Sequence, residues 1–285
     1  MTAAMDPSIA GLWVYPVKSC KGIALSSSRL TTRGLEHDRE WMIVRSGGDP
    51  ARFVTQREYP RLALIRTALS DSALTLSAQG SDDLHIEFGR GGERHAVVVW
   101  RDTVFAFDQG DDAAQWLSSF IGEELRLVRF DASSERLCNR DFAGDSGAHT
   151  GFADGYPLLV VSSASLNDLN ARLEERGQAG LPINRFRPNL VIDGLNAYDE
   201  DHLSSMRIGG TGDVELRMVK PCVRCQITTT DQQTAVVGDE PLPTLAGYRM
   251  NPDLGGVTFG VNAIVTGGVG ATINTGASIA VEWNF

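Results

Sequence analysis

Short strand patterns separated by turn residues constrain the fold of this chain more than any other feature. Ser72–Ala78, Leu84–Phe88 and Ala96–Trp100 have strand character, and turns that contain Gly or Asp divide them. Strands at this spacing favour a barrel or a sandwich over a parallel sheet with helical crossovers. Further strands are predicted at Ile9–Val17, Trp41–Val44, Leu62–Ile65, Leu125–Phe130, Pro157–Ser162, Leu190–Asp193 and Val214–Val219, with two or three antiparallel strands after Gly255.

Two helical patterns interrupt the predicted strands. Asp111 or Asp112 is expected to cap the first helix, and Gly122 to end it. Ser163 or Ser165 is expected to cap the second. The apolar faces comprise Ala113, Trp116, Leu117, Phe120 and Ile121 in the first helix, and Leu166, Leu169 and Leu173 in the second. The predicted fold class is therefore α+β and β-rich.

Composition excludes several classes of function. The 285 residues are 42% hydrophobic, enough for one large domain or two ordinary ones. A formal charge of −10 argues against binding a nucleic acid polymer, and the lack of an 18-residue apolar run argues against a membrane span. The N-terminus shows no secretory signal, and four cysteines in a chain this long do not make a disulfide scaffold. We expect reduced thiols and a cytoplasmic location.

The segment VKPCVRCQITTTD, residues 219–231, offers the best candidate chemistry. Pro221 is expected to end the preceding strand, which would place Cys222 and Cys225 on a loop. Arg224 is expected to help keep Cys225 deprotonated, and Gln226–Thr230 can resume as a strand. The spacing alone leaves three alternatives open: a metal site, a redox pair, or two buried structural thiols.

Side chains that donate hydrogen bonds stand near the ends of several predicted strands. Lys18 and Ser19 precede a glycine and could form a small anion-binding turn, or an ordinary polar turn with solvated lysines. Arg39 lies at the start of another strand, where it could reach a phosphate or pair with a neighbouring carboxylate. Donors of this kind near a thiol pair suit a phosphorylated, metal-bearing cofactor.

Two more donors flank Pro188. Because the residue before a proline is biased toward an extended backbone, Arg187 and Asn189 are expected to point the same way. Residues 131–156 are rich in Ser, Asp, Gly and Asn, which predicts a linker or an active-site loop. Cys138 and His149 in this stretch are interpreted as structural and as an ordinary loop histidine, respectively.

At this point the motifs resemble a known family. The segments VYPVKSCKGI, DREW, TQREYPRLALI, RFRPNLVI and GDVELRMVKPCVRCQITTTD resemble, in order, those of the MOSC family, and in particular the amidoxime-reducing components. The match runs nearly from end to end. It implies an N-terminal MOSC β-barrel-like domain over residues 1–130, a connecting or active-site loop over 131–156, and a MOSC β-barrel domain with a few helices over 157–285.

The resemblance also implies a molybdenum cofactor, with pyridoxal phosphate not expected. Cys225 matches the cysteine that binds molybdenum, whereas Cys222 matches one that does not bind it. Asp154 matches an aspartate near the metal and is expected to assist proton delivery or to order water. Gly155 and Tyr156 stand where the family carries small hydroxyl residues. Residues that match cofactor-binding positions are Lys18, Ser19, Arg39, Arg187, Asn189 and Arg224.

The activity implied by the resemblance is reduction of N-hydroxylated compounds, namely amidoximes, hydroxylamines and N-hydroxylated bases. The chain's own cysteines cannot hold an iron–sulfur cluster, so electrons are expected from a separate flavoprotein, ferredoxin or cytochrome. Two rival hypotheses remain at this point. The chain could carry the cofactor or transfer sulfur without turnover, or it could be a metal-free binding module with a structural cysteine pair.

Overall fold

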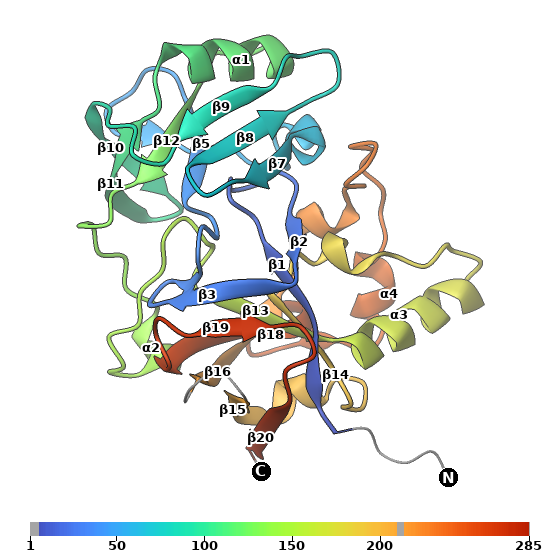
Figure 1. The fold of residues 1–285 in the computed structure, drawn as a ribbon. Coiled ribbons are helices and arrows are strands. Elements are labelled where there is room, and N and C mark those ends of the chain that lie inside the picture. The colour runs from blue at the N-terminus through green and yellow to red at the C-terminus, as the bar shows by residue number, and fades with distance from the viewer. Residues whose placement is uncertain (1–5, 210–213, 285) are drawn as a thin grey trace.

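The computed structural model describes residues 6–209 and 214–284. In Figure 1 the chain forms an upper part, made of the segment from β5 to β12, and a lower part that holds the remaining strands. The upper part contains a five-stranded sheet and a three-stranded meander. The first is ordered β5 (Trp41–Arg45), β12 (Leu125–Phe130), β11 (Asp102–Asp108), β10 (Arg94–Val99) and β6 (Ala51–Arg52); the second is β7 (Arg66–Leu69), β8 (Ala73–Ser77) and β9 (Leu84–Glu87).

Helix α1 (Asp111–Ile121) packs on this upper part and buries Ala113, Leu117 and Phe120. Gly122 ends it in a left-handed conformation, as predicted. The predicted side-chain cap is wrong, because Gly110 occupies the N-cap and Asp111 and Asp112 lie in the first turn. Acidic side chains are favourable there because the N-terminal end of the helix dipole is positive.

The lower part is a nine-stranded, nearly closed barrel-like sheet, which agrees with the predicted class. Its hydrophobic interior includes Val160, Leu190, Leu216 and Ala263. A small sheet of β19 (Thr272–Asn274), β3 (Ser27–Thr31) and β4 (Gly34–Leu35) lies beside it. The nine strands are β1 (Ser8–Val14), β2 (Ile23–Leu25), β13 (Leu158–Ser162), β14 (Leu190–Asp193), β15 (Leu203–Ile208), β16 (Val214–Val223), β17 (Met250–Asn251), β18 (Gly256–Gly267) and β20 (Ile279–Trp283).

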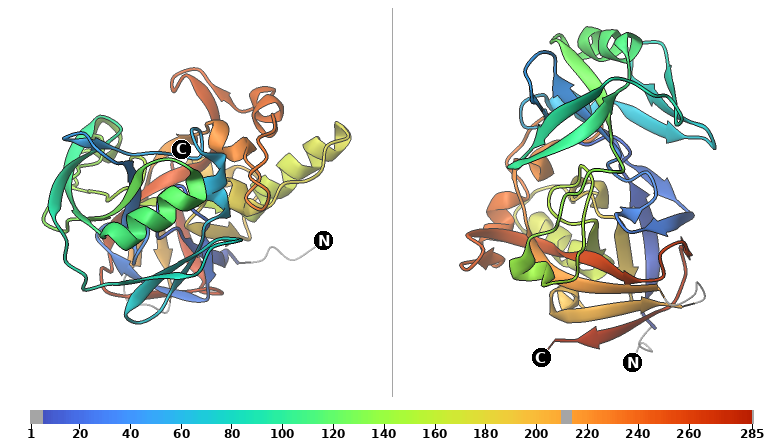
Figure 2. Two further views of the ribbon diagram at one scale, coloured as in Figure 1. Left: turned by 90° about the horizontal axis from the view of Figure 1, so that it is seen from above. Right: turned by 90° about the vertical axis from the view of Figure 1, so that its left-hand side faces the viewer.

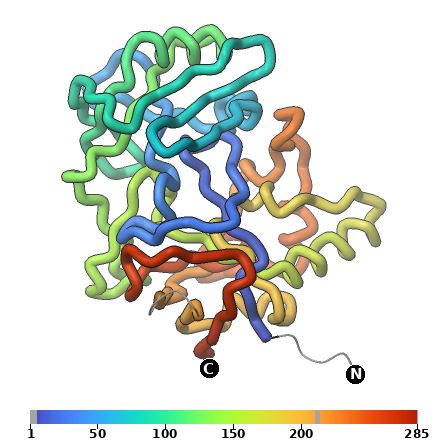
Figure 3. The backbone as a smooth tube through the Cα atoms, viewed as in Figure 1, coloured from blue at the N-terminus to red at the C-terminus, as the bar shows by residue number. Residues whose placement is uncertain are grey.

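The chain begins and ends its folded path in the lower part. β1 pairs with β14, so the first strands belong to the sheet that the second half of the chain completes. The chain then builds the upper part and returns through residues 131–156, drawn in yellow-green along one side of Figure 3. The right-hand view of Figure 2 shows the upper and lower sheets at opposite ends of the molecule, with this segment between them.

The remaining helices complete the fold, and their observed positions correct two predictions. Leu62–Ile65 was expected to be a strand, but Pro60 begins the 3-10 helix η1 (Pro60–Leu64) because its fixed φ suits a first helical position. Helix α3 (Ser163–Glu175) is capped by Ser162, whose hydroxyl accepts from the Ala164 N–H, and not by Ser163 or Ser165. The others are α2 (Arg140–Ala143), α4 (Leu242–Ala246), η2 (Ile183–Arg185), η3 (Asp199–His202) and η4 (Gln226–Thr229). No helix within residues 6–209 and 214–284 is long and apolar enough to cross a membrane.

Candidate cofactor-binding cleft

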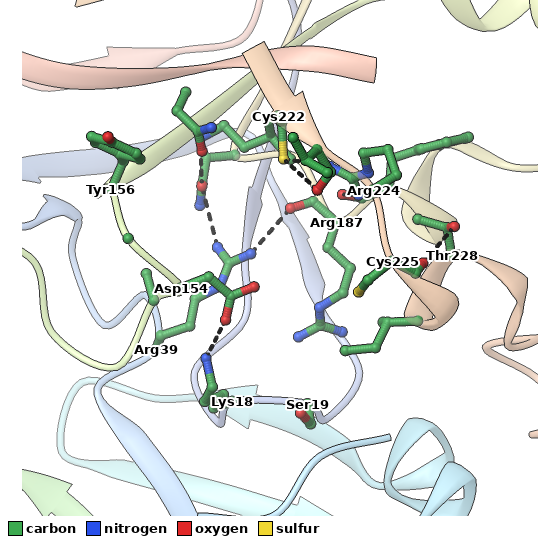
Figure 4. A pocket seen from close by; sticks show the side chains of 18 of the residues that line it. Lys18, Ser19, Arg39, Asp154, Tyr156, Arg187, Cys222, Arg224, Cys225 and Thr228 are labelled. Carbon is green, nitrogen blue, oxygen red and sulfur yellow. Dashed lines mark hydrogen bonds and ion pairs between the residues drawn. The ribbon is translucent and has the colours of Figure 1, made fainter. Parts of the chain in front are cut away.

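A cleft of about 820 Å3, including its open mouth, lies between the upper and lower parts. All eight residues predicted for the site line it: Lys18, Ser19, Arg39, Asp154, Arg187, Asn189, Arg224 and Cys225. Figure 4 shows most of them around one space, and they come from segments far apart in the sequence. The structure therefore brings the predicted residues together.

The strand before the cysteines continues further than predicted. β16 runs through Pro221 and ends at Val223, so Cys222 lies within the strand and not on a loop. The pairing of β16 with β18 shifts register between Met218 and Lys220 and again between Pro221 and Val223. Proline is tolerated at such bulges, where its missing N–H disrupts no regular ladder.

Cys225 lies at the N-terminal end of η4, where a strand had been expected. The Thr228 hydroxyl donates to the Cys225 carbonyl at 3.0 Å, and the Thr229 hydroxyl donates to the Gln226 carbonyl at 2.9 Å. These bonds hold the β-branched threonines in a tight turn. The Cys225 sulfur faces the cleft and has no hydrogen-bond partner among the described residues.

Arg224 does not serve Cys225 as predicted. Its guanidinium donates to the Cys222 sulfur at 2.9 Å and to the Phe186 carbonyl at 2.6 Å. Its Nε is buried without a partner in the part of the chain that the structure describes. Figure 4 shows Cys222 beside Arg224, apart from the sulfur of Cys225. The two thiols therefore differ, since one is engaged by the protein and the other is free.

Lys18 and Ser19 form a tight turn on the floor of the cleft. The Lys18 side chain is only 7% exposed, so it is not the solvated lysine of the alternative interpretation. Its ammonium donates to the Phe152 carbonyl at 2.8 Å and to Asp154 at 2.5 Å. Ser19 adopts a φ of +69°, and the buried Gln56 amide donates to its carbonyl at 2.6 Å.

Asp154 faces the mouth of the cleft, and its side chain is 70% exposed. Its carboxylate accepts from Lys18 and, at 3.2 Å, from the indole N–H of Trp100. Enclosure by protein would raise the pKa of Asp154, but the adjacent Lys18 ammonium outweighs this and holds that pKa well below its usual range. Burial lowers the pKa of Lys18, and Asp154 opposes that shift.

Arg39 is paired with the neighbouring carboxylate that the sequence allowed as its alternative partner. It donates to Asp38 at 2.5 Å, and also to the Asn189 side chain at 3.2 Å and the Arg187 carbonyl at 3.1 Å. The Asn189 amide group in turn donates to the Trp13 carbonyl at 3.2 Å. Asn189 therefore links strands around the cleft as well as lining it.

Arg187 has the least compensated charge in the cleft. Its φ of +55° is left-handed, so the extended conformation expected before Pro188 is wrong. The guanidinium donates to the Cys20 carbonyl at 2.7 Å and packs 4.1 Å from the Tyr15 ring centroid, without a carboxylate partner among the described residues. Burial and the nearby charge of Arg39 lower the pKa of Arg187 to about 10, so it stays cationic at neutral pH.

The cleft as a whole is cationic and carries one free soft ligand. Its lining includes four basic side chains and a single acidic one, Asp154. Within the described residues no group of three or more His, Cys, Asp or Glu side chains could hold a metal by itself. Tyr156 and Gly155 also line the cleft, whereas Cys138 and His149 do not.

Sequence reasoning missed two important residues. Trp100 lines the cleft from the turn between β10 and β11, although the sequence placed it only as a strand end. Arg136 is buried and donates to Asp102 at 2.6 Å, to the Gly151 carbonyl at 3.0 Å, to the Asp154 carbonyl at 2.8 Å, and to the Ala153 carbonyl. It thereby holds the loop that presents Asp154. The only signal in the sequence for these two residues was that Trp100 is a tryptophan next to a predicted turn.

Comparison with known proteins agrees with this geometry. Residues 6–124 match the MOSC N-terminal beta barrel domain, and residues 147–280 match the MOSC domain. Mitochondrial amidoxime-reducing component 1 of Mus musculus is 38% identical over 253 residues, which cover 85% of this chain and 72% of that protein. The chain belongs to the MOSC family. The family membership predicted from the motifs is therefore confirmed.

Two further relatives carry different names. Mitochondrial amidoxime reducing component 2 of Bos taurus is 35% identical over 253 residues, covering 85% of this chain and 72% of that protein. Molybdenum cofactor sulfurase of Oryza sativa subsp. japonica is 34% identical over 285 residues, covering 91% of this chain but 32% of that protein. The names of both relatives associate this MOSC chain with reductive enzymes and with molybdenum cofactor chemistry.

Proposed function

We propose that this protein binds a molybdenum cofactor in the cleft and uses it to reduce N-hydroxylated compounds. The observation that carries the proposal is the meeting of a free thiol, Cys225, with a surplus of cationic side chains in one cleft. The relationship to amidoxime-reducing components supports the reaction. Turnover would consume two electrons and two protons per N–O bond cleaved, and would release an amine or amidine and water.

The donor set fits such a cofactor. Lys18 is paired with Asp154, and Arg39 with Asp38, which leaves the guanidinium groups of Arg187 and Arg224 without carboxylates in the described part of the chain. Two uncompensated guanidinium groups suit a terminal phosphate and a polar pterin. The Cys225 thiol is a ligand type that soft metals prefer. Cys225 would hold the metal, and Lys18, Ser19, Arg39, Arg187, Asn189 and Arg224 would hold the organic part.

The bound cofactor would supply the two electrons, while side chains of the chain handle orientation and protons. Because the pKa of Asp154 lies below its usual range, its carboxylate is ionised and accepts hydrogen bonds from substrate N–H groups or from water. Lys18 holds the proton of this pair and lies 2.5 Å from Asp154. The pair can therefore orient the N–O group at the mouth and relay a proton toward the departing oxygen.

A separate electron donor, namely a flavoprotein, ferredoxin or cytochrome, belongs to this proposal. A cytoplasmic location, expected from the sequence, also belongs to this proposal. The rival hypothesis of a cofactor carrier or sulfur-transfer protein also has support, because the match to the plant cofactor sulfurase covers 91% of this chain. Turnover separates the two functions.

The first test compares Cys225→Ala with Cys222→Ala after expression in a cofactor-competent host. We expect about one molybdenum per chain in the wild type and in Cys222→Ala, and almost none in Cys225→Ala, because only the Cys225 sulfur is free. Elemental analysis gives the metal content, and far-UV circular dichroism checks the fold. Equal metal retention in both variants would overturn the ligand assignment.

Turnover is then measured on the loaded wild type with a reduced viologen dye and an amidoxime. Amidine formation supports the reductase. A loaded protein that leaves the amidoxime intact supports the carrier.

A further inference from the structure

Trp100 occupies an unusual backbone position. It is the first residue of the two-residue turn between β10 and β11, where Val99 pairs with Asp102, and its φ is +58°. Such turns normally place Gly, Asn or Asp at positions with positive φ, because a bulky side chain is strained there. Strain of this kind persists where surrounding contacts hold it, and it is concentrated at functional sites.

The surroundings of Trp100 hold it firmly. Asp102, at the end of the same turn, accepts from the buried Arg136 at 2.6 Å. The Phe53 ring meets the indole edge-on at 5.1 Å between centroids, and the Arg57 guanidinium lies 4.7 Å from the indole centroid. The indole lines the cleft, whereas Arg57 does not.

The indole lies beside the exposed carboxylate at the entrance of the cleft, and the Lys18 ammonium is 5.8 Å from its centroid. Its N–H donates to Asp154, whose side chain is 70% exposed at the mouth. Among the residues proposed to hold the cofactor, Ser19 and Asn189 are buried. A molecule that enters toward Cys225 therefore passes the Trp100 indole, whose N–H is hydrogen-bonded to the Asp154 carboxylate.

Resting on the proposed function, we infer that Trp100 is a specificity-determining residue that stacks on planar substrates. The ring offers a face to an aromatic or conjugated group, while Asp154 accepts from the N–H donors of the head group. The cleft therefore selects aromatic N-hydroxylated compounds over aliphatic ones that carry the same head group. The two parts of the molecule contribute separately to substrate recognition and reaction. Trp100, in the upper part, recognises the body of the substrate, and Cys225, in the lower part, lies at the reaction centre.

The test uses two probes with one head group, benzamidoxime and acetamidoxime, on the loaded enzyme with a reduced viologen dye. In Trp100→Leu we expect the ratio of the two kcat/KM values to fall about tenfold, mainly through KM for benzamidoxime. Trp100→Phe keeps a ring and should stay within about threefold of the wild type. Trp116→Leu, on helix α1 outside the cleft, should leave the ratio unchanged.

A second measurement does not depend on turnover. Calorimetry with benzamidine and acetamidine should show the same loss of preference in Trp100→Leu. Trp100→Gly tests the strain directly, because Gly suits the positive φ; this variant should fold and yet lose the preference.

An unchanged preference in Trp100→Leu, or equal losses for both probes, would overturn the inference and leave the proposed function standing. If the loaded wild type reduces neither amidoxime, the proposed reaction fails, and the amidine binding ratio alone decides the role of Trp100.

Discussion

The charged side chains of the cleft and those buried in the lower part are satisfied in different ways. Arg185 and Arg187 lie two residues apart, yet Arg185 donates to the Asp231 carboxylate at 3.0 Å whereas Arg187 reaches only a backbone carbonyl. Interior charge is therefore neutralised by the protein itself. Part of the positive charge in the cleft has no carboxylate partner among the described residues, as a site for an anionic ligand requires.

The acids differ between the two regions in the opposite sense, because the cleft acid has a cationic partner and the buried acid has none among the described residues. Asp154 lies beside an ammonium at the cleft mouth, and its pKa is held below the usual range. Glu200 is fully buried and accepts from the Ser162 N–H at 3.1 Å and from the Ser165 hydroxyl at 2.7 Å. Burial raises the pKa of Glu200 to about 7. A carboxyl group at the ligand site stays ionised, while one in the core tends to be neutral.

The largest expected effect concerns Arg136, which links Asp102 in the upper part to the loop that presents Asp154. Arg136→Gln should lower the free energy of unfolding by about 4 kcal/mol, because several buried carbonyls and Asp102 lose their donor. Urea denaturation measures this loss. Arg94→Gln is the control: Arg94 pairs with Asp131 at 2.7 Å but is 45% exposed, so it should lose less than about 1 kcal/mol. Equal losses would contradict the expected larger contribution of the buried Arg136 network to stability.

Glu200→Gln should change how stability depends on pH. From its ordinary pKa of 4.5 up to about 7, the folded state keeps a proton that the unfolded state releases, so this group's contribution to stability falls as pH rises. The Gln variant lacks that loss. Its free energy of unfolding should therefore gain about 3 kcal/mol relative to the wild type between pH 4.5 and pH 8.

Urea denaturation at several pH values tests this prediction, and Glu58→Gln is its control. Glu58 and its partner Arg45 are 43% and 45% exposed, so this replacement should shift the same curve only slightly. Parallel curves for the wild type and Glu200→Gln would contradict a neutral buried acid.

The smallest effects come from the matched pair Arg185→Met and Arg187→Met. Arg185→Met should lose about 2 kcal/mol of stability, since Asp231, which is 35% exposed, is left without its partner. Arg187→Met should leave stability within about 1 kcal/mol of the wild type, because it removes an uncompensated buried charge. It should instead retain about tenfold less molybdenum after dialysis.

Denaturation and elemental analysis on the same preparations separate the two arginines. The reverse pattern, with metal lost from Arg185→Met and stability lost from Arg187→Met, would break the distinction between the cleft and the interior.

The sequence predicted those elements of the fold whose bounds are set by the residues within and next to them. β12 and β14 have the bounds expected for them, because apolar and β-branched runs are flanked by turn residues. The residues of the cleft were identified through motifs in segments far apart in the chain, and the structure brings those segments together. How the chain divides into domains stays a prediction, while β1 and β2 are seen to complete the lower sheet.

What escaped prediction depends on contacts distant in sequence or on backbone conformations that residue type disfavours. The threonines after Cys225 suggested a strand, but their hydroxyls bond to carbonyls three residues back and form η4. Nothing in the local sequence directs Arg224 to Cys222 instead of Cys225. Trp100 has a backbone conformation that its side chain disfavours. Most hydrogen-bond partners of Arg136 are backbone carbonyls, which every residue type carries, so the sequence does not mark them.

The pairing of β1 with β14 has a consequence for synthesis of the chain. Ser8 pairs with Asp193, so the first strand is made about 180 residues before its partner. At about 5–20 residues per second, its backbone groups wait on the order of 10–40 s for the strand that satisfies them. A nascent chain that stalls before β14 leaves an open sheet edge, the kind of surface on which aggregates grow.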